Sequence, residues 1–217
     1  MRLLLAGGTG LIGGEVLRLG LKNGHEIMTV GRRPTGMASS EVVSSFDDLP
    51  QLPPADIAIC ALGTTIRQAG TKAAFRAIDE KAVSSFAKAA KAAGVDHFLV
   101  VTAVGANPDA SIFYSRVKGQ TEDQLMMMGF KRLDIIRPGL LLGDRKERRP
   151  IELLLQHIAP ATDLLMRGKW RRYRSVQAAD AAHCLLGLAA SNEPGVYIHH
   201  FDDIMKVLQS PLQDVTK

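Results

Sequence analysis

The strongest constraint on the fold is an abrupt change of composition near the start of the chain. The segment LLLAGGTGLIGGEV, residues 3–16, passes from an apolar run through closely spaced glycines into an amphipathic stretch. Glycine weakens helices and strands alike. Its concentration at the junction of the two therefore indicates that another group approaches the backbone there. A phosphate is the group that such a junction favours.

Three of these glycines have a recognisable spacing. Gly7, Gly10 and Gly13 read G-x-x-G-x-x-G, directly after a predicted strand (residues 2–7) and at the start of a predicted helix (residues 11–22). The first glycine permits a tight turn, the second lets a diphosphate touch the backbone, and the third lets the helix pack closely on the strand. A tight turn without a ligand is the alternative, but the strand–turn–helix context favours dinucleotide binding.

The end of the second predicted strand, residues 25–32, bears on which dinucleotide is bound. A cofactor without a 2′-phosphate is held at this place by an acidic residue, whereas the segment TVGRRP supplies Arg32 and Arg33. Guanidinium groups suit a phosphate dianion, so NADP(H) is favoured over NAD(H). The alternative is that these arginines are solvated loop charges.

Apolar runs and helical stretches alternate along the rest of the chain. The predicted strands are residues 2–7, 25–32, 41–46, 55–63, 97–105 and 132–139, with a short one at 195–200. The predicted helices are residues 11–22, 72–93, 112–128, 151–158 and 177–190. Strands that are apolar throughout and separated by helices indicate a parallel sheet with both faces covered. The predicted fold class is α/β, a doubly wound parallel sheet of the Rossmann type with a small C-terminal cap.

Length and charge limit the domain organisation and the partners. At 217 residues the chain is predicted to be a single NAD(P)-binding domain, residues 1–217, in which residues 144–217 close one side of a cleft. The formal net charge of +5 favours anionic ligands without indicating nucleic acid. The oligomeric state is left open by the sequence.

The location follows from segments that the chain does not show. No apolar run reaches the roughly eighteen residues needed to span a bilayer, and the apolar part of the opening MRLLLAGG is short for a signal peptide. A cytoplasmic location with no membrane partner is therefore predicted. Cys60 and Cys184 lie in apolar surroundings and are predicted to be buried free thiols in a reducing compartment.

A tyrosine and a lysine form a candidate catalytic pair. In FYSRVKGQ, residues 113–120, Tyr114 and Lys118 fall on one face of a predicted helix. An ammonium group stabilises a nearby phenolate, so such a tyrosine can exchange a proton with a carbonyl or alcohol oxygen as hydride is transferred. The lysine can also bind ribose hydroxyls. A surface pair is the alternative, and the position after the predicted strand 97–105 favours catalysis.

Several segments together resemble a known family. The similarity lies in AGGTGLIGGEV, CALGTTIRQAG, FRAIDEKAV, HFLVVTAVGA, FYSRVKGQTE and IIRPGLLLGDRKERRP. The chain resembles the atypical short-chain dehydrogenases/reductases, and more closely the Tat-interactive-protein oxidoreductase group and its bacterial relatives. The matching segments span residues 5–150, about two thirds of the chain, and the last is much more specific than the glycine triplet.

The resemblance implies a Rossmann fold that binds NADP(H) and, with the glycine spacing, assigns the site. The cofactor contacts fall on Gly7, Thr9, Gly10, Leu11, Ile12, Gly13, Arg32, Arg33, Ala61, Leu62, Gly63, Lys118 and Pro138. The catalytic residues fall on Tyr114 and Lys118, with Thr102 where the family has a serine that holds the substrate carbonyl. The acid that touches adenine after the third strand is replaced by Ser44, with Asp47 as the nearest alternative.

Other polar clusters carry weaker signals. The segment RGKWRRYR, residues 167–174, combines five basic residues with two aromatic ones, a composition that can bind nucleic acid. The modest net charge favours a loop beside the cofactor cleft that contacts an anionic substrate. The segment DRKERRP, residues 144–150, is interpreted as solvated charges. The histidines lack metal-ligand spacing, so no metal site is predicted, and His97 is expected to be structural.

Two hypotheses of function remain, with a third less favoured. The first is an NADP(H)-dependent oxidoreductase acting on a small carbonyl or alcohol substrate, with Tyr114 as acid/base. The second is a non-catalytic NADP(H)-binding module whose C-terminal third meets a protein partner. Epimerase or dehydratase chemistry on a nucleotide sugar is less favoured, because the C-terminal third is small for a substrate domain.

Overall fold

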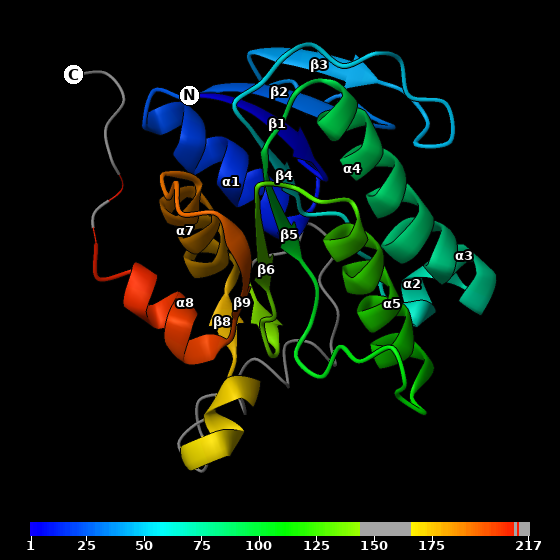
Figure 1. Cartoon of the computed structure of the whole chain (residues 1–217), viewed down its shortest axis with the longest axis vertical. Helices are drawn as coiled ribbons and strands as arrows, with labels where there is room; N and C mark the ends of the chain where they lie inside the picture. The colour runs from blue at the N-terminus through cyan, green and yellow to red at the C-terminus, as the bar shows by residue number, and fades with distance from the viewer. Residues whose placement is uncertain (144–165, 211, 213–217) are drawn as a thin grey trace.

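A seven-stranded parallel sheet forms the centre of the computed structural model, which describes residues 1–143, 166–210 and 212 (Figure 1). The strands follow the order β3-β2-β1-β4-β5-β6-β9. They are β1 (Arg2–Ala6), β2 (Glu26–Gly31), β3 (Ser40–Val43), β4 (Ile57–Cys60), β5 (His97–Val101), β6 (Arg132–Ile136) and β9 (Gly195–His199). The doubly wound α/β class predicted from the sequence is confirmed, and the reversal of strand order falls between β1 and β4.

Helices cover both faces of this sheet (Figure 1). They are α1 (Leu11–Lys22), α2 (Ile66–Ala69), α3 (Lys72–Arg76), α4 (Val83–Ala92), α5 (Phe113–Met127), α7 (Ala178–Ala189) and α8 (Phe201–Val207). Helix α1 has the predicted bounds, because glycine at Gly10 begins it and Asn23 caps its end before Gly24, whose φ is +74°.

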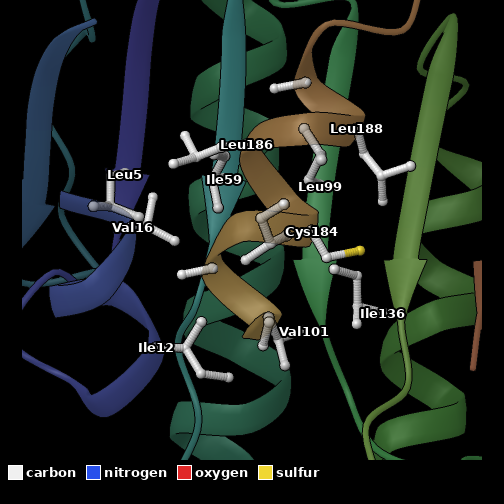
Figure 2. Packing of buried hydrophobic residues seen from close by; sticks show 14 of the residues in the cluster. Leu5, Ile12, Val16, Ile59, Leu99, Val101, Ile136, Cys184, Leu186 and Leu188 are labelled. Atoms are coloured by element: carbon white, nitrogen blue, oxygen red, sulfur yellow. The ribbon is translucent and has the colours of Figure 1, made fainter. Parts of the chain in front are cut away.

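Two apolar cores result, one on each face. Figure 2 shows the first, in which side chains of α1 and α7 pack on the sheet between Leu5 and Ile136. The second core lies on the opposite face and joins Phe86 of α4 and Leu125 of α5 to strand residues such as Phe98. Because the inner strands are covered on both faces, they are mainly apolar rather than alternating, as in β1 and β4.

The long alanine-rich helix predicted at residues 72–93 is interrupted. A π-helical turn, η1 (Ala77–Ala82), stands between α3 and α4. Such wider turns insert one residue into the helical repeat and often occur at functional sites. Here the turn carries a fully buried aspartate, Asp79.

The C-terminal part of the described chain contributes to the sheet itself. Strand β9 pairs with β6 in parallel, so the short strand predicted at 195–200 is the seventh strand of the main sheet. A small second sheet pairs β7 (Leu141–Leu142) with β8 (Val176–Gln177). The helix predicted at 151–158 and the charged segment 144–150 lie outside the described residues.

Two further sequence expectations concern cysteines and membrane helices. Cys60 and Cys184 are both free and buried, as predicted. Burial raises the pKa of each thiol to about 12, so both are uncharged at neutral pH. Within the part of the chain that the structure describes, no helix combines the length and apolar character required to cross a membrane.

One buried carboxylate connects three strands of the sheet. Asp134 of β6 is fully buried and receives the Nε of Arg132 at 2.6 Å. The Nε2 atoms of His97 on β5 and His199 on β9 each lie 2.7 Å from its oxygens. Burial alone would raise the pKa of Asp134, but the hydrogen bonds from the two histidines and the arginine outweigh it and hold that pKa well below its usual range.

Removal of this carboxylate should destabilise the fold strongly. Asp134→Asn leaves the buried Arg132 guanidinium without its counter-charge, so we expect the free energy of unfolding to fall by about 3–5 kcal/mol at pH 7. Asp56→Asn is the matched control, because it removes the partner of the exposed Arg2, and should cost less than about 1 kcal/mol. Urea unfolding measures both variants.

The pH dependence follows from the sign of the shift. A carboxyl whose pKa is lower in the folded state stabilises the protein fully above its unfolded value of about 3.9 and loses that contribution as the pH falls through the folded value. The stability difference between wild type and Asp134→Asn should therefore narrow below about pH 4. A difference that stays constant in acid would contradict this account.

Candidate functional site

The predicted phosphate loop lies at the switch point of the sheet. Ala6 at the end of β1 pairs with Cys60 at the end of β4, and the Ala61 amide donates to the Ala6 carbonyl at 2.9 Å. Gly7 follows with a φ of +87°, which favours glycine. A Cβ on Gly7 would lie 2.7 Å from the Ala61 carbonyl carbon. Ligands of open α/β sheets bind where the strand order reverses, at the carboxyl ends of the strands.

The other two glycines let the turn fold tightly. The Gly10 amide donates to the Gly7 carbonyl at 2.8 Å. A Cβ on Gly13 would lie only 2.1 Å from the same carbonyl oxygen, so a side chain there would force helix and strand apart. The structure thus brings Gly7, Gly10 and Gly13 into the arrangement that their spacing predicts.

The N-terminus of α1 faces outward from this turn. Its N-cap is Gly10, no side chain caps it, and its first turn contains no acidic residue. Thr9 and Gly10 are exposed, whereas Ile12 is buried in the core and Leu11 packs against it. The free N–H groups and the partial positive charge of the helix end suit an anionic group. Ile12 can contribute only through its backbone.

The two arginines after β2 are available to a ligand. Arg32 and Arg33 are exposed and directly follow the last residue of the strand, Gly31. Within the described residues, neither guanidinium has a hydrogen bond or an ion pair. Ser44 after β3 donates its hydroxyl to the Asp48 carbonyl at 2.7 Å, and Asp47 is exposed.

Lys118 forms a buried ion pair with Asp79 that was not predicted from the sequence. Its Nζ lies 2.7 Å from Oδ1 of Asp79, and the side chains are 5% and 0% exposed. Burial alone would lower the pKa of Lys118, but the Asp79 carboxylate outweighs it, so that pKa lies above its usual range. The lysine therefore carries a positive charge at neutral pH.

Asp79 is itself held from two sides. Its second carboxylate oxygen accepts the Thr64 amide at 2.9 Å, and its backbone carbonyl accepts the Thr121 hydroxyl of α5 at 3.0 Å. A Cβ on Gly63 would lie 3.5 Å from Oδ1 of Asp79 and 3.7 Å from Nζ of Lys118. The segment after β4, which contains Ala61, Leu62 and Gly63, therefore joins the glycine turn to the ion pair.

Tyr114 lies one helical turn before Lys118, on α5. Its ring is partly buried and packs on the ring of Phe75 with centroids 5.4 Å apart. Its electrostatic interaction with Lys118 is one of the causes that raise the pKa of that lysine. The structure thus keeps Tyr114 and Lys118 together, and Asp79 is the ion-pair partner of Lys118.

Thr102 does not fit the role of holding a substrate carbonyl. Its hydroxyl is buried and donates to Oε1 of Glu122 at 2.5 Å, while Arg137 forms an ion pair with the same carboxylate. The hydroxyl proton is therefore used inside the protein. This corrects the expectation that Thr102 replaces the serine of the family, and the reason is that Glu122 approaches from α5.

Pro138, the last of the predicted cofactor contacts, lies in the loop that follows β6. The carbonyl of Pro138 accepts the Val104 amide at 2.9 Å, which joins the segments that follow β5 and β6. A Cβ on the next residue, Gly139, would lie 2.3 Å from the Arg174 carbonyl oxygen. The basic segment 167–174 therefore passes directly beside this loop.

The basic segment, residues 167–174, contains a short helix, and one of its arginines forms an ion pair with an aspartate. It forms a 3₁₀ helix, η2 (Gly168–Tyr173), at the end of the molecule where the main strands terminate (Figure 1). Arg171 pairs with Asp202 of α8 at 2.6 Å, whereas Trp170 is 59% exposed. Among the described residues, no group of His, Cys, Asp and Glu side chains could hold a metal ion.

A signal for Asp79 was present in the sequence. Phe75, Asp79, Ala82, Val83 and Phe86 follow the spacing of one helical face, and the other four are apolar. A charged residue on the apolar face of a helix requires a buried partner. That partner cannot be named from the pattern, because it lies on another helix.

The comparison with known sequences decides the family. Protein FMP52, mitochondrial, of Meyerozyma guilliermondii is 36% identical over 156 residues, which cover 67% of this chain and 67% of the relative. Protein fmp52, mitochondrial, of Aspergillus niger is 35% identical and covers 71% of this chain and 73% of the relative. HTATIP2 of Rattus norvegicus is 38% identical over 60% of this chain and 55% of its own length.

The chain belongs to the atypical short-chain dehydrogenase/reductase family of FMP52 and HTATIP2. The resemblance seen in the sequence is thereby confirmed. No family model matches the sequence. The mitochondrial names of the fungal relatives contradict the cytoplasmic location predicted above, and that prediction is wrong.

Solved structures support the fold of the family. Human epimerase family protein SDR39U1 with NADPH has a TM-score of 0.67 at 22% identity, over 92% of this chain and 74% of that one. UDP-N-acetylglucosamine 4-epimerase from Bacillus cereus has a TM-score of 0.71 at 17% identity, over 96% and 83%. At these identities the likeness shows the Rossmann fold.

Two neighbouring glycines of α1 should respond to alanine in opposite ways. Gly13→Ala places a methyl group against the Gly7 carbonyl, so we expect a loss of about 1–3 kcal/mol in unfolding free energy. Gly14→Ala meets only the Gly8 carbonyl oxygen at 3.6 Å and should gain about 0.5–1 kcal/mol from helix propensity. Urea unfolding of both variants measures the contrast, and equal effects would show that the close approach is not required.

Proposed function

We propose that the protein is an NADP(H)-dependent oxidoreductase that acts on a small carbonyl or alcohol substrate. The observation that carries the proposal is the buried pair of Lys118 and Asp79, placed between the segment after β4 and Tyr114. A buried charge pair is costly to build, and this one fixes a cation where the family binds the ribose and the reacting carbonyl.

The residues fit a dinucleotide along the carboxyl end of the sheet. The uncapped N-terminus of α1 and the bare backbone at Gly7 and Gly10 suit the diphosphate. Arg32 and Arg33 directly follow β2, at the chain position where an acidic residue would favour NAD(H), and this supports a preference for NADP(H). Among similar solved structures, human SDR39U1 is in complex with NADPH, whereas MoeE5 and the Bordetella bronchiseptica enzyme WbmH are in complex with NAD.

The proposed chemistry assigns one task to each residue. The bound nicotinamide supplies or accepts the hydride. Tyr114 donates a proton to the carbonyl oxygen, or accepts one from the alcohol in the reverse direction. Lys118 remains protonated and binds the ribose hydroxyls, one helical turn from Tyr114. Asp79 holds the lysine in place and acts only through it.

A second function is favoured by one observation. The hydroxyl of Thr102 is used by Glu122, which leaves the substrate carbonyl without the polar contact that the family serine provides. A non-catalytic NADP(H)-binding module that meets a protein partner would need no such contact. The two proposals share the cofactor and differ in whether Tyr114 transfers a proton.

The cofactor preference can be tested by direct binding. In the double variant Arg32→Ala, Arg33→Ala we expect the NADPH dissociation constant to rise by about tenfold or more, since hydrogen bonds to charged groups contribute roughly 1.5–3 kcal/mol. NADH binding should change little. Arg18→Ala removes one positive charge from the exposed face of α1, as a control. Equal affinities of the wild type for NADPH and NADH, by calorimetry, would contradict the preference.

The role of the tyrosine separates the two functions. Tyr114→Phe should leave the NADPH dissociation constant within about twofold of wild type and lower turnover of an accepted carbonyl by about 10²–10⁴. The measurement is NADPH oxidation with a panel of aldehydes and ketones, beside calorimetry. Tyr197→Phe, on β9, is the control for loss of a tyrosine hydroxyl. Binding without turnover of any panel member would favour the module.

A further inference from the structure

The loop between β2 and β3 is closed by one carboxylate. Oε1 of Glu41, on β3, accepts the backbone amides of Thr35 at 2.8 Å and Gly36 at 2.9 Å, and also the Thr35 hydroxyl. The amides of Met37 and Ala38 in turn donate to the Thr35 hydroxyl oxygen, each at 3.3 Å. A single side chain thus fixes the turn that follows the two arginines.

This turn also touches the phosphate loop. A Cβ on Gly8 would lie 3.1 Å from the Thr35 methyl carbon and 3.0 Å from that of Thr29. Thr29 is the strand partner of Glu41 in the pairing of β2 with β3. Glu41 therefore holds Thr35 in place against the backbone of the glycine turn.

The short segment that carries Arg32 and Arg33 is anchored at both of its ends. Arg32 and Arg33 lie between Gly31, at the end of β2, and Thr35, which Glu41 holds. Their side chains make no hydrogen bond or ion pair within the described residues, so the anchored backbone sets the region that the guanidinium groups can reach. A short segment anchored at each end has few conformations to lose when a ligand binds.

The charge of Glu41 is stabilised by the same contacts. The hydrogen bond from the Thr35 hydroxyl, with those from the Thr35 and Gly36 amides, outweighs burial and holds the pKa of Glu41 below its usual range. The carboxylate is thus an acceptor for the loop throughout the neutral range.

We propose that Glu41 is a positioning residue for cofactor specificity, which holds the loop so that Arg32 and Arg33 meet the 2′-phosphate. The inference rests on the proposed NADP(H) binding. In this role Glu41 acts through the loop that it holds, and not by binding the cofactor directly. An acid near the adenosine disfavours a phosphate by repulsion, and the amide and hydroxyl dipoles that point at the Glu41 carboxylate offset part of that repulsion.

Three variants separate the effect of Glu41 on the position of the loop from the effect of its charge. Glu41→Ala removes both the acceptor and the charge, Glu41→Gln keeps a carbonyl acceptor and removes the charge, and Glu26→Ala removes an exposed charge at the other end of β2. The readouts are dissociation constants for NADPH and NADH by calorimetry. Amide hydrogen exchange at Thr35 and Gly36, without nucleotide, reports the loop itself.

We expect Glu41→Ala to lower the preference for NADPH over NADH by about tenfold, which corresponds to one lost charge-assisted contact. Exchange at Thr35 and Gly36 should accelerate in the same variant. Glu41→Gln should keep most of the preference, and Glu26→Ala should match wild type. A purely structural role of Glu41 would weaken the binding of NADPH and NADH equally. The ratio of the two dissociation constants therefore decides between the two roles.

Three results would overturn the inference. Faster exchange with an unchanged ratio would show that the loop does not set specificity. Tighter NADPH binding in both Glu41 variants would show that the residue acts by repulsion alone. Selective loss of NADH would show that it binds ribose hydroxyls directly. If wild type and all variants bind neither nucleotide, the proposed function fails, and hydrogen exchange still tests whether Glu41 holds the loop.

Discussion

The buried ion pair of Lys118 and Asp79 is the interaction on which the candidate site depends. It joins α5 to the π-helical turn before α4, and Thr64 connects it to the segment after β4. A lysine in an apolar environment would otherwise lose its proton or avoid burial. With the carboxylate present, it remains charged and in a defined position. The same ion pair therefore positions the lysine of the candidate site and holds α5 against the π-helical turn.

The same principle recurs at two other places along the carboxyl end of the sheet. Glu122 receives both Arg137 and Thr102, and Glu41 receives the turn after the arginines. In each case a carboxylate satisfies several donors and fixes a loop that follows a strand. Glu122 is buried, and a buried polar group is stable only when its partners are in place. Rigid loops around a solvent-facing helix end are what a dinucleotide site requires.

The fold was largely predictable because its signals are local. Apolar runs, glycines and helical spacing indicated the six strands up to Ile136 and the bounds of α1. Two features were not predicted, for physical reasons. The π-helical turn continues the helical spacing of residues 72–93. The strand predicted at 195–200 is present as β9, but it is short and half exposed, with no apolar run to indicate that it joins the main sheet.

The sequence by itself determined the glycine turn, the position of the arginines and the spacing of Tyr114 and Lys118, because neighbouring residues in the chain create these features. Only the tertiary structure decided which groups those residues meet. Asp79 and Lys118 are 39 positions apart, and the Thr102 hydroxyl donates its hydrogen bond to Glu122, which lies on a different element. Spacing along one chain cannot determine such contacts, since they arise when separate helices and strands pack together.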